Sequence, residues 1–89
     1  MTLAEYLYRQ DQSNRAFAAQ IGVSIEYVRL LRAARRRPSP HIAERIEQAT
    51  ASKVTLDDFN RAYRAQEQGI SPYAQLGAMR RRAAHVGRS

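Results

Sequence analysis

The chain contains no cysteine, and among its fifteen basic residues Lys53 is the only lysine. The absence of cysteine excludes a disulfide framework and a thiolate metal site, and it fits an intracellular protein. No apolar run approaches the roughly 18 residues that a membrane-spanning helix needs, and no basic segment followed by an apolar one marks a signal peptide. We therefore expect a soluble, cytoplasmic protein with no metal, no cofactor and no membrane partner.

The length of the chain limits the kind of function that it can perform. Its 89 residues leave room for one domain, and 44% hydrophobic with 26% charged residues is the composition of a globular protein. A domain of this size buries only about 60% of its unfolded surface, so a deep substrate cleft would use up much of the core. No nucleophile–base pair or carboxylate pair stands out. We expect a binding module and not an enzyme.

The net charge of +7 points to a nucleic-acid partner. Residues 1–59 carry nine basic and seven acidic side chains, whereas residues 60–89 carry six basic and one acidic. Five arginines with no acid among them occur between positions 29 and 37: Arg29, Arg32, Arg35, Arg36 and Arg37. The guanidinium fork suits phosphate and guanine edges, so an arginine-rich surface favours nucleic acid. The alternative is a basic but solvated surface without a specific partner.

Helix start and stop signals recur along the chain, and no segment alternates apolar and polar residues as a strand does. We predict an all-α protein with helices at about residues 3–10, 14–20, 25–34 and 40–49, and a fifth from residue 56 that Gly69 stops. The predicted N-caps are Thr2, Ser13, Ser24, Ser39 and Thr55, of which Thr2 and Thr55 have the spacing of capping boxes with Glu5 and Asp58. We place the domain at residues 1–59 and a basic, helical extension at 60–89.

Residues 14–33 fill a twenty-residue pattern in which small and apolar residues stand at fixed places. The seven places hold Phe17, Ala18, Ile21, Gly22, Val23, Val28 and Leu31. Ala18 lets two steeply crossing helices approach, and Gly22 permits the tight turn between them. The pattern predicts a helix-turn-helix unit.

Three stretches carry a resemblance to a known family: AFAAQIGVSIEYVRLL (16–31), RRPSPHIAERIEQAT (36–50) and KVTLDDF (53–59). The sequence resembles the Cro/repressor-like helix-turn-helix regulators of phages and bacteria, particularly the small Cro-like and YdaS-type proteins, over about residues 3–59. Two positions depart from the family: Ala34 stands where such proteins often have glycine, and Ala51-Ser52 replaces a glycine-containing turn. The resemblance implies a compact five-helix domain and a transcriptional regulator that binds a specific DNA operator.

The resemblance also implies that the helix at 25–34 enters the major groove and presents its first residues to base edges. The matching positions are Ser24, Ile25, Glu26, Arg29 and Leu30. Arg29 could hold guanine with a bidentate fork, and Glu26 could accept a hydrogen bond from cytosine or simply favour the helix N-terminus. Ile25 and Leu30 have no core place in the motif, so we expect thymine-methyl contacts, with a peripheral core contact as the alternative for Leu30.

Phosphate contacts are expected from residues around this helix. Asn14 matches the family position whose side chain and N–H address phosphate at a helix N-terminus. The full set is Asn14, Arg15, Tyr27, Arg32, Arg35, Arg36 and Arg37. Charge runs are often merely solvated, so we expect only some of these residues to engage DNA.

A single helix-turn-helix reads few base pairs, so we expect a homodimer on double-stranded DNA, with contact to RNA polymerase if the protein activates. In the extension, Tyr63, Ile70, Tyr73, Leu76 and Met79 could self-associate and Arg80, Arg81 and Arg82 could follow phosphates; the alternative is a frayed tail. Two other functions stay open. One is an autoregulating antitoxin that holds a toxin, and the other is a basic RNA-binding protein, although no RNA-recognition motif is present.

Overall fold

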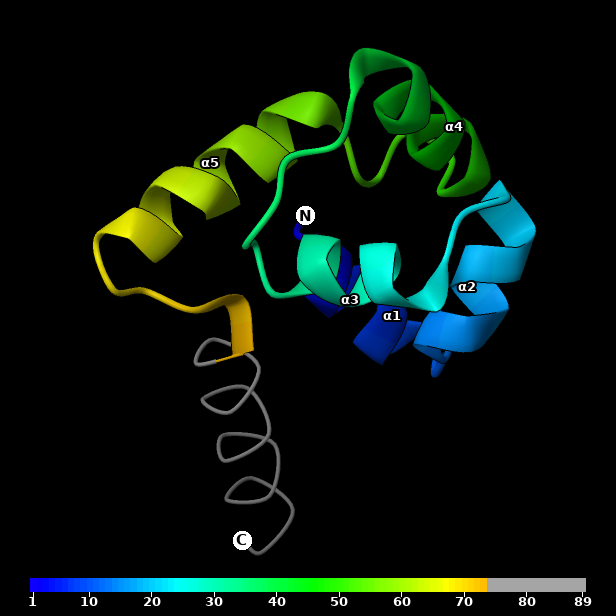
Figure 1. Ribbon diagram of the computed structural model, residues 1–89, viewed down its shortest axis with the longest axis horizontal. Coiled ribbons are helices and arrows are strands. Elements are labelled where there is room, and N and C mark those ends of the chain that lie inside the picture. The colour runs from blue at the N-terminus through cyan, green and yellow to red at the C-terminus, as the bar shows by residue number, and fades with distance from the viewer. Residues whose placement is uncertain (74–89) are drawn as a thin grey trace, which may run out of the picture.

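The computed structural model describes residues 1–73, and this part of the chain folds into five α-helices without a strand (Figure 1). The helices are α1 (Leu3–Arg9), α2 (Asn14–Ile21), α3 (Ile25–Arg32), α4 (Pro40–Ala49) and α5 (Leu56–Glu67). The all-α prediction is thus confirmed for these residues. None of the five helices has the length and apolar character to cross a membrane. The predicted roles of Leu76, Met79 and Arg80 to Arg82 fall outside the described residues.

All five helices begin at the predicted N-cap, where a Ser or Thr oxygen accepts a backbone N–H three residues ahead. The capping box of α5 is complete, because the carboxylate of Asp58 also accepts the N–H of Thr55 at 2.9 Å. The predicted box of α1 forms only by half. The hydroxyl of Thr2 accepts the Glu5 N–H at 3.1 Å, but the Glu5 carboxylate pairs with Arg9 on the next turn.

Glycine follows α2 and α5, as predicted at Gly22 and Gly69, but the other three helices end without one. Left-handed backbone follows each helix, and only two of the six residues among positions 1–73 that adopt it are glycine: Asp11, Gly22, Ala34, Ala51, Ser52 and Gly69. At the end of α3, Ala34 has φ of 59° and the N–H of Arg35 donates to the carbonyl of Leu30 at 3.0 Å. Helix α3 therefore stops at Arg32, two residues earlier than predicted. The chain makes the left-handed corners at Ala34 and Ala51 without the glycine that would relieve them.

One hydrophobic core joins all five helices. It consists of Leu3, Leu7, Phe17, Ala18, Ile21, Val28, Leu31, Ile46, Val54 and Phe59, and it includes every predicted inward residue of α2 and α3. The buried polar residue Thr50 is satisfied, because its hydroxyl donates to the Ile46 carbonyl at 2.8 Å and accepts the Val54 N–H at 3.2 Å. Thr50 thereby ties the end of α4 to the segment that leads into α5.

Helix α2 packs against both α3 and α4, α1 packs against α3, and α4 packs against α5 (Figure 1). Helix α5 runs without interruption from residue 56 to residue 67. The domain boundary placed at residues 59 and 60 therefore falls inside a helix, with Phe59 in the core and half-buried Tyr63 one turn further along. The folded unit continues past the predicted boundary.

Candidate nucleic-acid interface

A three-residue turn connects α2 to α3. Gly22 adopts φ of 75°, and the N–H groups of Gly22 and Val23 both donate to the carbonyl of Ala18, at 2.9 and 3.0 Å. From α4, Nη1 of Arg45 donates to the Ile21 carbonyl at 3.3 Å and so satisfies a second acceptor at this helix end. Ala18 is only 2% exposed, as expected for a small residue between two helices. These contacts set the direction in which α3 leaves the turn.

Helix α3 has one side in the core and one side exposed. Ser24, Glu26 and Arg29 are exposed, whereas Ile25, Tyr27 and Leu30 are half-buried. Ile25 and Tyr27 pack against the core cluster. The statement that Ile25 has no core place is therefore wrong, because its side chain covers the edge of the core at the first turn of α3. Leu30 is half-buried but outside that cluster.

Two of the three polar residues predicted to read bases, Glu26 and Arg29, meet on the exposed side of α3. Nη1 of Arg29 lies 2.8 Å from Oε2 of Glu26, and both side chains are about two-thirds exposed, at 61% and 65%. The pair spans one helical turn. Both side chains stay accessible to a partner, but in the free protein they form an ion pair with each other.

Two residues predicted to contact phosphate are joined at the beginning of α2. Nη1 of Arg32, from the last turn of α3, donates to Oδ1 of Asn14 at 2.8 Å. Because Oδ1 is engaged, Asn14 retains its Nδ2 amide as a donor, which makes no hydrogen bond within residues 1–73. Nε of Arg32 is buried without a partner in the same part of the chain. Exposed Arg15 follows Asn14 at this helix N-terminus.

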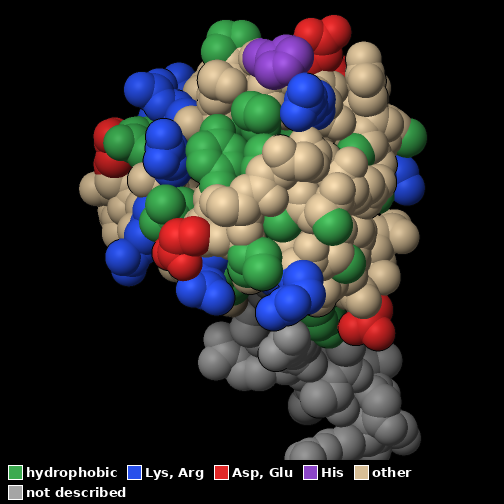
Figure 2. Space-filling model, turned by 45° about the vertical axis from the view of Figure 1, so that its right-hand side comes forward, with side chains coloured by type: hydrophobic (Ala, Val, Ile, Leu, Met, Phe, Trp, Pro, Cys, Tyr) green, Lys and Arg blue, Asp and Glu red, His purple; other side chains and the backbone are tan. Residues whose placement is uncertain are grey.

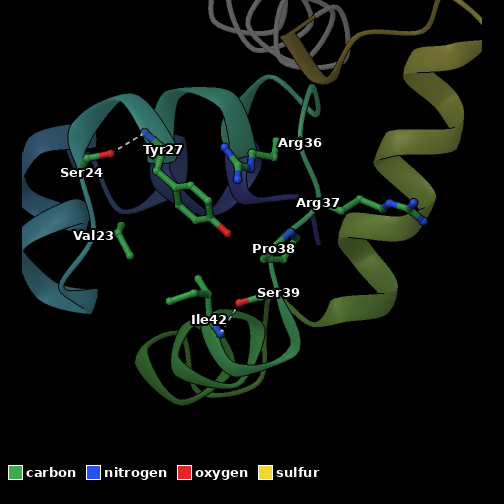
Figure 3. A pocket seen from close by; sticks show the side chains of 8 residues that line it. All are labelled: Val23, Ser24, Tyr27, Arg36, Arg37, Pro38, Ser39 and Ile42. Atoms are coloured by element: carbon green, nitrogen blue, oxygen red, sulfur yellow. Dashed lines mark hydrogen bonds between the residues drawn. The ribbon is translucent and has the colours of Figure 1, made fainter.

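An open groove of about 570 Å³ separates the start of α3 from the start of α4 (Figure 3). Its lining residues are Val23, Ser24, Tyr27, Arg36, Arg37, Pro38, Ser39 and Ile42. Ser24 caps α3 and Ser39 caps α4, so two helix N-termini border one groove. Helix N-termini carry partial positive charge and attract anions. Sequence reasoning missed Ser39 and Ile42 here, since only the fold brings α4 beside α3.

The adjacent residues Arg36 and Arg37 point in different directions (Figure 3). The guanidinium carbon of Arg36 lies 5.1 Å from the ring centroid of Tyr27, on the groove. That of Arg37 lies 4.8 Å from the ring centroid of Tyr63 on α5. Arg35 is exposed beside them. The arginine run therefore does not form one uniform patch.

Acidic partners are missing from most of the predicted phosphate contacts. Within residues 1–73, ion pairs join Met1 to Asp58, Glu5 to Arg9, Glu26 to Arg29 and Asp57 to Arg61. Arg15, Arg32, Arg35, Arg36 and Arg37 take part in none of them. Figure 2 shows Lys and Arg side chains gathered on the left and lower parts of one face, with acidic side chains scattered between them.

Residues 1–73 contain no group of three or more His, Cys, Asp or Glu side chains that could hold a metal ion. No protein-family model matches the chain, and neither a curated protein nor a solved structure matches it.

Proposed function

We propose that the protein is a sequence-specific DNA-binding transcriptional regulator in which α2, the Gly22 turn and α3 act as a helix-turn-helix. Helix α3 is short, capped and exposed on one side, which suits insertion into a major groove about 12 Å wide. The core contacts of Val28 and Leu31 hold it against α1 and α2. Its first turns then face the bases.

The observation that carries the proposal is the set of arginines around α3 that form no ion pair within residues 1–73. Phosphate contacts from such side chains give binding energy and fix the position of the protein on the duplex. Two positions suit phosphates: the start of α2, with Asn14 and Arg15, and the groove between α3 and α4, with Arg36 and two helix N-termini. The proposed phosphate set is Asn14, Arg15, Tyr27, Arg32, Arg35 and Arg36.

Base reading is assigned to the exposed side of α3. Arg29 would donate two hydrogen bonds to guanine, and Glu26 would accept one from a cytosine amino group. Ser24 precedes them at the N-cap, and the half-buried Ile25 and Leu30 present apolar edges suited to thymine methyl groups. This assignment gives α3 a preference for G·C pairs near its middle.

One such helix contacts few base pairs, so the proposal includes a two-fold homodimer on a palindromic operator in the nucleoid. Half-sites about 34–36 Å apart place both recognition helices on one side of the duplex. A bound dimer can repress by excluding RNA polymerase, or activate by contacting it from a neighbouring site.

Selection of bound sites from random double-stranded DNA tests this function. We expect enrichment of a palindrome with half-sites about one helical turn apart. Arg61→Ala provides a control, since Arg61 pairs with Asp57 on α5 and should not alter the selected sequence. Retention of DNA without an enriched motif, or equal affinity for structured RNA, would contradict the proposal.

A further inference from the structure

The linker between α3 and α4 has little backbone support. After Arg35, the N–H groups of Arg36, Arg37 and Ser39 form no hydrogen bond within residues 1–73, and Pro38 has no N–H to give. The linker nevertheless forms one wall of the groove. Its position must therefore depend on side-chain contacts.

Three side chains provide those contacts. Pro38 is buried, Arg36 lies over Tyr27, and Arg37 lies over Tyr63. Both guanidinium-to-ring distances are below the roughly 6 Å within which a cation is attracted to an aromatic face. Tyr63 stands one turn after the core residue Phe59, so α5 presents its ring from a fixed place. Figure 3 shows Arg37 extended toward α5 and away from Tyr27.

We propose that Arg37 and Tyr63 form a clamp that fixes the linker to α5 and so positions Arg36 and the α4 N-terminus for phosphate. Arg37 is then a positioning residue and not a phosphate contact, because its guanidinium lies over the Tyr63 ring on α5 and points away from Tyr27 (Figure 3). This inference rests on the proposed DNA binding. It gives α5 a part in that binding although α5 lies outside the α2–α3 unit.

Salt dependence separates the two roles. A phosphate contact releases counterions when DNA binds. Its loss therefore makes the negative slope of log K against log salt shallower by about 0.9. The loss of a positioning contact weakens binding, because the linker must then be ordered when the complex forms. Arg36 still reaches its phosphate in that complex, so the number of neutralised phosphates stays unchanged. Arg36 and Arg37 are neighbours with the same charge, so Arg36→Gln is a matched control for Arg37→Gln.

The experiment measures affinity of the full chain for its selected operator, and for a random duplex, at several salt concentrations. We expect Arg36→Gln to reduce the magnitude of the slope by about 0.9. Arg37→Gln should leave the slope unchanged and weaken binding about 3- to 10-fold on both duplexes, the range that a cation–π contact supports. Tyr63→Leu should do the same, and Tyr63→Phe, which keeps the ring, should bind as the wild type does.

The double variant Arg37→Gln/Tyr63→Leu should bind no more weakly than either single variant, because each change removes the same contact. A slope lowered equally by Arg37→Gln and Arg36→Gln overturns the clamp, and so do additive effects in this cycle. Melting curves ensure that each variant is compared while it is folded. If Tyr63→Leu does not fold, the salt dependence of Arg37→Gln alone still tests the clamp. Wild-type protein that binds no DNA contradicts the proposed function itself, which is a distinct result.

Discussion

Arg29 and Glu26 form an ion pair along the exposed side of α3, with 2.8 Å between Nη1 and Oε2. Exposed pairs of this kind contribute about 0–1 kcal/mol to stability, so the pair matters little to folding. Its consequence concerns recognition. In the proposed complex Arg29 must exchange the carboxylate for a base edge, and Glu26 places a negative charge near the phosphates.

Glu26→Gln should therefore reduce discrimination between DNA sequences. Removing the charge favours every duplex by roughly 1 kcal/mol, the scale of one charge–charge term near a protein surface in salt. Specific binding gains less, because the charged acceptor for the cytosine amino group is replaced by a weaker, neutral amide oxygen. The measurement is the ratio of affinities for operator and random DNA, which should fall. An unchanged or larger ratio would show that Glu26 only stabilises the helix N-terminus.

The close approach of α2 and α3 at Ala18 predicts a steric limit. Ala18→Leu should destabilise the fold by about 1–3 kcal/mol, because the added methylenes must fit between packed helices. The exposed neighbour Ala19 gives the control, since Ala19→Leu should change the free energy of unfolding by less than about 0.5 kcal/mol. Urea unfolding measures both, and equal midpoints would remove the steric argument.

The left-handed corner after α4 predicts a stabilising substitution. Ala51 has φ of 53° and is exposed, so Ala51→Gly loses no packing and relieves about 1 kcal/mol of backbone strain. In contrast, Ala19→Gly within α2 should destabilise by about 1 kcal/mol. Thermal unfolding should therefore shift in opposite directions for the two variants. A lower melting temperature for Ala51→Gly would contradict the left-handed assignment.

Asp58 predicts a loss of stability in acid. Burial raises the pKa of its carboxyl, but the hydrogen bond from the Thr55 N–H, together with those from the Met1 ammonium and the Thr55 hydroxyl, outweighs burial and lowers the pKa overall. A carboxyl whose pKa is lower in the folded state than in the unfolded state stabilises the protein at pH values above its unfolded pKa, about 3.9. That contribution disappears as pH falls through the lower folded pKa.

Unfolding free energies from pH 7 to about pH 2.5 check this linkage. Asp58→Asn should be less stable than the wild type at neutral pH, and the difference should shrink below about pH 4. A difference that stays constant with pH would assign the role of Asp58 to packing alone.

Much of this fold follows from local rules. The starts of α2, α3 and α4 are predictable from the sequence, because each begins at a serine whose side chain caps it: Ser13, Ser24 and Ser39. The ends of α1, α3 and α4 are not, because Asp11, Ala34 and Ala51 adopt a backbone conformation that their side chains disfavour. For this reason α3 is shorter than its sequence suggests.

In the candidate interface, too, contacts within one helix are predictable from the sequence and contacts between elements are not. The spacing of Glu26 and Arg29 on one helix indicates that they are neighbours, whereas the link between Arg32 and Asn14 crosses from one helix to another. The opposite directions of Arg36 and Arg37 depend on two tyrosines from different elements. A charge run in the sequence shows how many cations are present, but not which ring each one faces.

The central claim is that α3 reads DNA sequence, and Arg29→Ala tests it most directly. Its affinity is measured on the selected operator and on a series in which each base pair is changed in turn, beside Arg36→Ala on the same series. Arg29→Ala should lose about 1–3 kcal/mol on the operator and relax the preference at one position, since a bidentate base contact is lost. Arg36→Ala should weaken all sequences alike, and a uniform loss for both variants would contradict the placement of α3 in the major groove.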